Sequence, residues 1–343
     1  MINTTYRILL LSFCIGLFSP LLSSCSSGSA SHQAALDAKK AQFQKLKPNL
    51  SLPLVNRVQR MPTDLIDANQ AFDKSIGIIS SGPYQARAAT DDELALIQSS
   101  ITLLPPVLQK VLTEKLLGIY LVDNFPGGGL TDWVVDGEGR VYYYMVFNSA
   151  QLTTSVDDWL SLKDNSPFDD SNPRLSIKVQ TQTPYKALLY GLLHEGAHVL
   201  DYELGITPYV DTLHKSLKNL KRETTEFTTG VWVTQKTPKA EYDFAHRSKM
   251  NFYRIFPKLK LIPRTEMPAL FVQLKQTPFV SFYSGNSWNE HLADYFTYYH
   301  LEKKLGGSIT LQLLDQGKVI DSYAPLKTSS AQRLEKTMAP FYP

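Results

Sequence analysis

The chain of 343 residues contains very little cysteine: its two cysteines are Cys14 and Cys25. Both lie in the N-terminal segment, so the rest of the chain cannot be held together by disulfides. Its stability must therefore come from a hydrophobic core. A chain of this length is ample for that, because the fraction of surface buried on folding rises with size.

An excess of charge of one sign is also missing. Lysine and arginine number 35 and aspartate and glutamate 32, which leaves a formal net charge of +3. No basic run with interleaved aromatic residues occurs, so the sequence predicts no nucleic-acid partner. The small basic excess is compatible with an anionic cell-envelope surface.

Long hydrophobic runs are absent apart from residues 8–22, which are short for a membrane-spanning helix. Arg7 precedes this run, as in a signal peptide, and the run ends in Leu22-Ser-Ser-Cys25, which resembles the bacterial lipobox. The resemblance implies cleavage before Cys25 and lipidation of its thiol. Ser26 then favours the outer membrane of a Gram-negative bacterium. A plain secretory peptide or an uncleaved anchor is the alternative.

The segment His194-Glu-Gly-Ala-His198 carries the most chemical information. Two histidines four residues apart lie on one face of a helix, so both imidazoles can bind the same zinc ion. Glu195 then projects toward a water on that ion and can act as its general base. A single histidine here would by default be a hydrogen-bonded core residue. The pair with Glu195 between them favours a zinc hydrolase.

The flanking residues predict one complete helix from Pro184 to Leu204. Thr183 is a good N-cap, and proline suits the first helical position. Gly205 suits the left-handed position after the helix end. Much of the segment is apolar, as expected for a helix buried behind an active site.

Two histidines leave a zinc site incomplete, since catalytic zinc usually has three protein ligands. Glu290 is the candidate for the third, and Asp294 shares its helical face and can accept the outward N–H of His194. However, Ser287 and Glu290 also form a capping-box pattern that needs no metal. In that case the third ligand must come from elsewhere. The spare histidines are His214, His246, His291 and His300.

With these residues the chain resembles the gluzincin metallopeptidases, and within them the anthrax lethal factor type of catalytic domain. The resemblance implies zinc ligation by His194, His198 and Glu290, with an acidic residue four positions after the glutamate. That family also has an aspartate three residues after the second histidine, where Asp201 stands. It has a tyrosine seven residues before the ligand glutamate, thought to assist at the scissile carbonyl, and Tyr283 holds that position.

The resemblance covers roughly residues 184–305 and rests on few positions. The spacing of 92 residues (290 − 198) between His198 and Glu290 is longer than in typical gluzincins. It predicts an inserted segment, which we place at 206–280. Two residues keep a second interpretation: Asp201 can be a helix-surface charge, and Tyr283 an ordinary aromatic residue.

The expected fold is α+β and zincin-like, with a mixed sheet whose edge strand lies behind the zinc helix, and a second helix that carries the third ligand. Residues 1–24 are a lipoprotein signal peptide, and residues 25–50 a lipid-anchored tether, helical around 34–45. Residues 51–182 form the helical and β-sheet part of the catalytic domain. Residues 183–343 form the zinc-binding helical part.

The pattern also predicts individual elements. A capping box starts a helix at Thr90, whereas residues 51–90 otherwise look irregular because of their prolines. Asp136 to Gly139 predicts a hairpin turn, and Asp315 to Gly317 a second one. Further expected strands cover 118–122, 132–135, 141–147, 175–181, 227–234, 309–314 and 318–323; further expected helices cover 106–117, 288–305 and 329–338.

The sequence thus predicts a zinc metallopeptidase of the cell envelope, anchored to the membrane by lipid at Cys25, that cleaves a peptide or protein substrate. One alternative is a non-catalytic zincin-like lipoprotein for binding or assembly. Intact Glu195 argues against it, because a pure binder needs no general base. The other alternative is a zinc amidase that acts on peptidoglycan peptides, and no feature of the sequence separates it from a peptidase.

Overall fold

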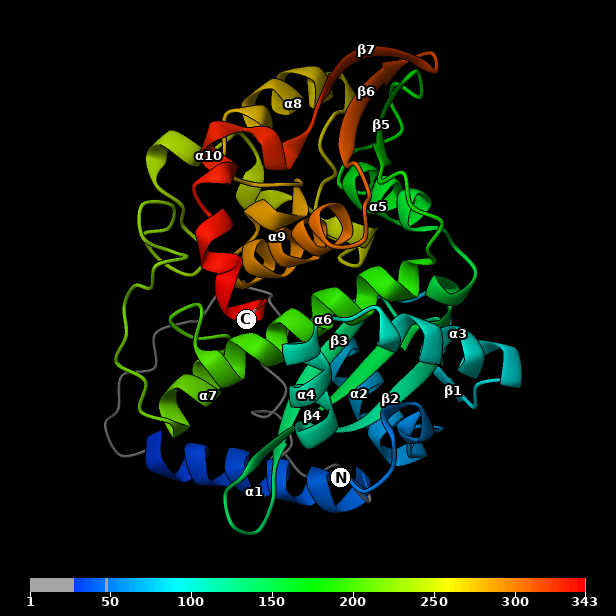
Figure 1. Ribbon diagram of the computed structural model, residues 1–343, viewed down its shortest axis with the longest axis vertical. Coiled ribbons are helices and arrows are strands. Elements are labelled where there is room, and N and C mark those ends of the chain that lie inside the picture. The colour runs from blue at the N-terminus through cyan, green and yellow to red at the C-terminus, as the bar shows by residue number, and fades with distance from the viewer. Residues whose placement is uncertain (1–27, 47–48, 343) are drawn as a thin grey trace.

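The computed structural model describes residues 28–46 and 49–342. The predicted signal peptide and Cys25 lie outside these residues. None of the helices in the described part has the length and apolar composition of a membrane span. The elements form an α+β fold with two sheets. Helix α6 (Ala187–Leu204) runs through the middle of the molecule, with the larger sheet on one side of it and helix α9 (Trp288–Lys303) on the other (Figure 1).

The larger sheet is mixed and has the strand order β1-β2-β4-β3. Strands β2 and β4 are parallel, whereas β3 and β4 form the antiparallel hairpin predicted around residues 136–139. The Asp136 carboxylate closes its turn by accepting the backbone N–H groups of Glu138 and Arg140. Strand β3 is an edge of this sheet. The bounds are β1 Gln85–Arg87, β2 Leu116–Asp123, β3 Gly129–Val135 and β4 Val141–Asn148.

Helices cover both faces of this sheet. Side chains alternate along β3, so that Trp133 and Val135 pack into the core shared with α6, and Leu130 and Val134 into the core on the opposite face. The face toward α6 is also covered by α3 (Asp91–Thr102) and α4 (Pro106–Lys115). The other face is covered by α1 (Gly28–Leu46) and α2 (Thr63–Ser75).

Helix α1 contains the helix predicted around residues 34–45. Its packing corrects the prediction of a free tether for the described part of residues 25–50. Ala35 and Lys39 are fully buried, and the Lys39 ammonium lies 2.6 Å from the Asp132 carboxylate of β3. The same ammonium stands over the ring of Trp133. The alanine-rich, polar composition of this segment does not predict such packing. The contact between Lys39 and Asp132 joins residues 93 positions apart in the sequence.

Residues 51–90 are likewise more regular than their prolines suggest. They contain the 13-residue helix α2 and strand β1. Pro62 stands just before α2 in an extended conformation, where the missing N–H costs no helical hydrogen bond. The proline therefore delimits the helix and does not break it. The next helix, α3, begins at the predicted capping box, with both bonds between Thr90 and Glu93 present.

Helix α6 ends at Leu204 as predicted, with Gly205 left-handed at φ 61°. It begins at Ala187, three residues later than expected. The Thr183 hydroxyl bonds the Thr181 hydroxyl instead of capping a helix, and the Ala187 N–H donates to the Thr154 carbonyl. The first contact holds the segment before α6 in a non-helical conformation, and the second joins its end to Thr154, so the helix starts only after them.

The smaller sheet is antiparallel, with the order β5-β6-β7, and includes the predicted hairpin around Gly317. Residues 227–234 form turns with one isolated bridge, from Trp232 to Pro238, so the strand expected there is wrong. The C-terminal helix is also shorter than expected and passes into a 3-10 helix, Glu335–Phe341. The remaining bounds are α5 Val156–Asn165, β5 Leu175–Gln180, α7 Thr212–Leu217, α8 Met267–Lys275, β6 Thr310–Asp315, β7 Lys318–Tyr323 and α10 Ser329–Gln332.

Candidate metal centre

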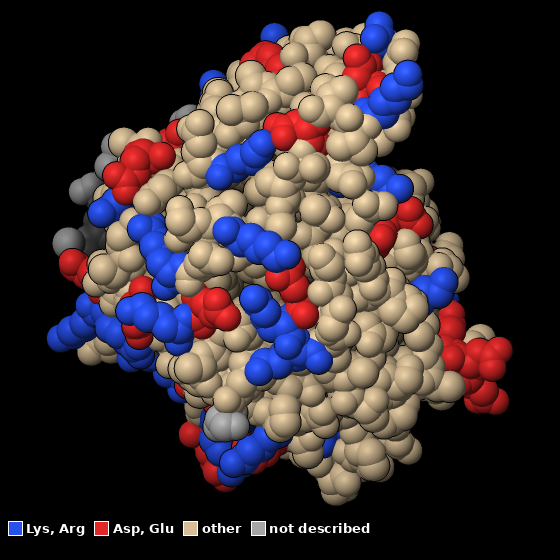
Figure 2. Space-filling model, turned by 45° about the horizontal axis from the view of Figure 1, so that its top comes forward, with Lys and Arg blue, Asp and Glu red and all other residues tan. Residues whose placement is uncertain are grey.

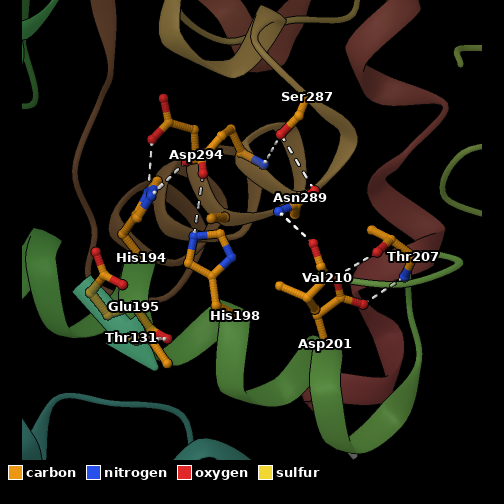
Figure 3. Close-up of polar contacts among 12 residues, drawn as sticks. Thr131, His194, Glu195, His198, Asp201, Thr207, Val210, Ser287, Asn289 and Asp294 are labelled. Carbon is orange, nitrogen blue, oxygen red and sulfur yellow. Dashed lines mark hydrogen bonds and ion pairs between the residues drawn. The ribbon is translucent and has the colours of Figure 1, made fainter. Parts of the chain in front are cut away.

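Helices α6 and α9 pack along each other and bring three predicted ligands together. Nε2 of His194 lies 3.1 Å from Oε2 of Glu290, and Nε2 of His198 lies 3.7 Å from Oε1 of the same carboxylate. The two imidazole rings are nearly perpendicular, at 86°. Both histidines project from α6 toward α9 (Figure 3). All three side chains are buried.

These residues fit a metal ion. The candidate donor atoms all lie within 4.8 Å of one another. Zinc–ligand bonds of about 2 Å in a tetrahedral shell require donor separations of roughly 3–4 Å, and the 3.1 and 3.7 Å contacts fall in that range. Two imidazole nitrogens and one carboxylate also match the donor set of a hydrolytic site with an open position. His194, His198 and Glu290 thus form a buried group that can hold a metal ion.

The capping pattern at Ser287 coexists with this arrangement. The serine hydroxyl accepts the backbone N–H of Glu290 at 3.3 Å and caps α9. The carboxylate of Glu290 meanwhile lies against both histidines. This N-cap bond does not exclude a ligand role for Glu290, since it uses the backbone N–H and not the carboxylate.

The four spare histidines have partners elsewhere. Nδ1 of His291 accepts the indole N–H of Trp232, and its Nε2 lies 3.2 Å from the Pro278 carbonyl oxygen. The remaining contacts are His246 with Glu266, His300 with Tyr342 and the Leu103 carbonyl, and His214 with the rings of Trp133 and Tyr202. None of the four belongs to the metal-binding group in the described residues.

Asp294 lies behind His194, as the spacing predicts. Its Oδ1 is 3.0 Å from Nδ1 of His194, which leaves Nε2 directed toward the metal position. It also accepts the hydroxyls of Tyr190 and Ser281. Such a carboxylate fixes the orientation and tautomer of a ligand imidazole.

Lys163 of α5 is the residue that sequence reasoning missed. Its ammonium lies 2.8 and 3.0 Å from the two oxygens of Asp294, and both side chains are completely buried. It also donates to Tyr190 and stands 4.7 Å from the centre of the Tyr283 ring. No local pattern marks this lysine, because its partner is 131 residues away.

Burial and these contacts shift the pKa values of the site in opposite directions. Burial opposes ionisation of Asp294, but Lys163 and His194 outweigh it and hold the pKa of that carboxyl below its usual range. Burial also disfavours the His194 cation, yet the hydrogen bonds to Asp294 and Glu290 raise its pKa to about 10. Among the described residues, no such carboxylate contacts the second nitrogen of His198, and burial lowers the pKa of this histidine to about 4.

Glu195 stands beside the edge strand β3. The Thr131 hydroxyl donates to its backbone carbonyl at 3.1 Å (Figure 3). A side chain at Gly129 would place its Cβ 3.2 Å from Oε1 of Glu195 and 2.9 Å from the Val146 carbonyl oxygen. Glycine at this position therefore permits the close approach of strand and carboxylate. Burial raises the pKa of Glu195 to about 7.

We call the space around these groups the metal cleft. It has a volume of about 60 Å³. Its lining consists of the first residues of β3, the α6 motif, Glu290 and three flanking side chains. The residues are Gly129, Leu130, Thr131, His194, Glu195, His198, Tyr202, Val210, Tyr283 and Glu290.

The two residues with open interpretations are placed as follows. Tyr283 lines the metal cleft, with its ring centre 5.8 Å from that of His194. Asp201 is buried and accepts both the N–H and the hydroxyl of Thr207, each at 2.6 Å (Figure 3). A surface charge is therefore the wrong interpretation of Asp201. It braces the chain that leads from α6 to Val210 on the cleft wall.

Comparisons with known proteins give no match: no family model, no curated protein and no solved structure corresponds to this chain.

Substituting Lys163 with methionine is expected to lower the free energy of unfolding by about 3–5 kcal/mol. The change leaves the Asp294 carboxylate buried without its cation, which is the costly way to break an ion pair. Urea unfolding of the metal-free protein measures the effect. Lys178→Met, at an exposed position of β5, is the matched control. An unfolding free energy of Lys163→Met within 1 kcal/mol of the wild-type value would be on the order of the effect of a surface ion pair. It would contradict the assignment of Lys163 and Asp294 as a buried pair.

Proposed function

We propose that this protein is a zinc-dependent metallopeptidase with a zincin-like fold. One observation carries the proposal: two helices bring the buried side chains of His194, His198 and Glu290 together, and Glu195 lies beside them. The mixed sheet with an edge strand against α6, and the second ligand helix α9, support the gluzincin type. Two imidazoles and a carboxylate favour zinc over the harder cations that prefer all-oxygen sites.

Each side chain has a separate task in this proposal. His194, His198 and Glu290 hold the ion, and Asp294 orients His194. A bound zinc ion supplies Lewis acidity and lowers the pKa of water toward about 7. Glu195 takes up the proton of the attacking water and passes it to the leaving amine. Tyr283 lines the metal cleft, and its hydroxyl would donate a hydrogen bond to the carbonyl oxygen that gains charge.

Strand β3 supports a peptide as the substrate. Its first residues line the metal cleft, and within the described part of the chain it has a strand partner on one side only. An extended peptide can add to such an edge through backbone hydrogen bonds, which would place an amide bond beside Glu195. The lipobox-like segment at Cys25 adds the proposal that the enzyme acts in the cell envelope as a lipoprotein.

The test is hydrolysis by the purified, zinc-loaded chain. Peptide libraries, folded proteins and peptidoglycan fragments are offered, and the products are identified by mass spectrometry. We expect cleavage of peptides that a chelator abolishes and added zinc restores. Cleavage confined to peptidoglycan fragments would identify an amidase. If the protein bound peptides but cleaved none of them, it would be a non-catalytic binder, and the proposal would be contradicted.

A further inference from the structure

A second cavity adjoins the metal cleft. It has a volume of about 550 Å³ and lies beside the C-terminal end of α6, between that helix, the start of β4 and α7. Tyr202 and Val210 line both this cavity and the metal cleft, so the two spaces meet at these side chains. We call it the basic cavity because lysine and arginine side chains line it. The metal cleft alone has room only for the atoms next to the scissile bond of a substrate.

Cationic side chains outnumber anionic ones in its lining. Four basic residues line it: Lys115, Arg140, Lys218 and Arg222. The two carboxylates in the lining already have internal donors, because Asp201 accepts from Thr207 and Glu203 accepts the Tyr143 hydroxyl at 2.8 Å. The surplus of positive charge is local, since the whole chain is close to neutral. On the face drawn in Figure 2, basic and acidic side chains lie beside one another where charged groups occur, with uncharged surface between them.

The four cations are not equivalent. Arg140 pairs with Asp136 and Glu138 of the hairpin turn, at 2.7 and 3.2 Å, so part of its charge is already balanced. Arg222 uses one guanidinium nitrogen on the Gly205 carbonyl, and a guanidinium has five N–H donors. Lys115 and Lys218 have no carboxylate partner among the ion pairs of the described residues. The two lysines are therefore the residues to substitute.

The helix fixes how far the basic cavity lies from the reacting bond. An α-helix rises about 1.5 Å per residue, so Tyr202 and Gly205 stand about 6 and 10 Å along the axis from His198. An extended peptide advances about 3.3 Å per residue. A substrate bound across the metal cleft thus reaches the basic cavity about two to three residues from the bond that is cut.

We propose that the basic cavity binds acidic side chains of the peptide substrate, and that the protein selects substrates with glutamate or aspartate two to three residues to one side of the scissile bond. This inference rests on the proposed function for the position of the substrate. The binding itself needs only the cavity and its charges. Ion pairs at such a partly exposed site are modest and weaken with salt.

The test measures binding without turnover. Glu195→Gln protein is titrated into two fluorescein-labelled peptide libraries that differ only in glutamate or glutamine at the positions two and three residues from the centre. Anisotropy at low salt should show the glutamate library bound about five- to tenfold more tightly, and 0.5 M salt should remove most of this preference. Because no hydrolysis is required, a failure of catalysis leaves this readout intact.

Two pairs of substitutions assign the preference to the cavity. Lys115→Gln with Lys218→Gln should reduce it to less than about twofold. Lys221→Gln with Lys318→Gln removes the same charge at exposed positions outside the cavity and should leave the preference unchanged. Three results would overturn the proposal. The protein could bind the two libraries with equal affinity, it could bind neither, or both double variants could lose the preference to the same extent.

Discussion

Replacing Glu195 with glutamine is expected to lower kcat by about a thousandfold, in the middle of the range for loss of a general base. The amide has the size of the carboxylate and fits the same space beside Gly129 and Thr131, but it cannot accept a proton. Zinc content should stay at that of wild type, because Glu195 lies outside the ligand group. Steady-state hydrolysis of the best peptide, with zinc measured on the same sample, checks both.

Glu114→Gln is the matched control for this prediction. Glu114 is exposed on α4, and its substitution makes the same chemical change away from the metal cleft. We expect it to keep wild-type activity. A Glu195→Gln protein that retains activity within tenfold of wild type would contradict the role of Glu195 as the general base.

Replacing Glu290 with alanine is expected to weaken metal binding by more than a hundredfold. The substitution removes one of three donors, and loss of residues that merely support ligands already costs 10–100-fold. It also leaves His194 and His198 without the carboxylate that lies 3.1 and 3.7 Å from their Nε2 atoms. Competition with a chromogenic chelator gives the affinity, and zinc after dialysis gives the stoichiometry.

Glu302→Ala on the same helix serves as the control, since Glu302 lies outside the metal-binding group. Circular dichroism of both variants shows whether α9 still folds. Stoichiometric zinc in folded Glu290→Ala protein would mean that the third ligand is another residue, and the assignment of Glu290 would be wrong.

The parts of the site that sequence predicts are those encoded within single helices. His194 and His198 are four residues apart, and so are Glu290 and Asp294, and a helix turns each pair onto one face. The hairpins and the capping box of α3 are equally local and form where expected. These features depend on neighbours within a few residues, which is the range that a sequence pattern reports.

The parts that sequence misses depend on distant partners. Lys163 reads as an ordinary helix lysine until the fold places it against Asp294. Lys39 reads as part of a polar tether until Asp132 accepts it in the core. Residues 227–234 are rich in aromatic and β-branched side chains, which is typical of a strand. The segment nevertheless has no neighbouring strand among the described residues and forms turns, with Phe227 and Trp232 against His291. Tertiary contacts decided each of these cases.

The central claim is that His194, His198 and Glu290 together hold one zinc ion. Anomalous diffraction at the zinc edge, from crystals of protein purified without chelators, tests it most directly because it locates the metal. We predict one peak per chain, about 2 Å from a nitrogen of each histidine and from a carboxylate oxygen of Glu290. A zinc-loaded crystal with no peak between these three side chains, or with its zinc bound elsewhere, would contradict the account.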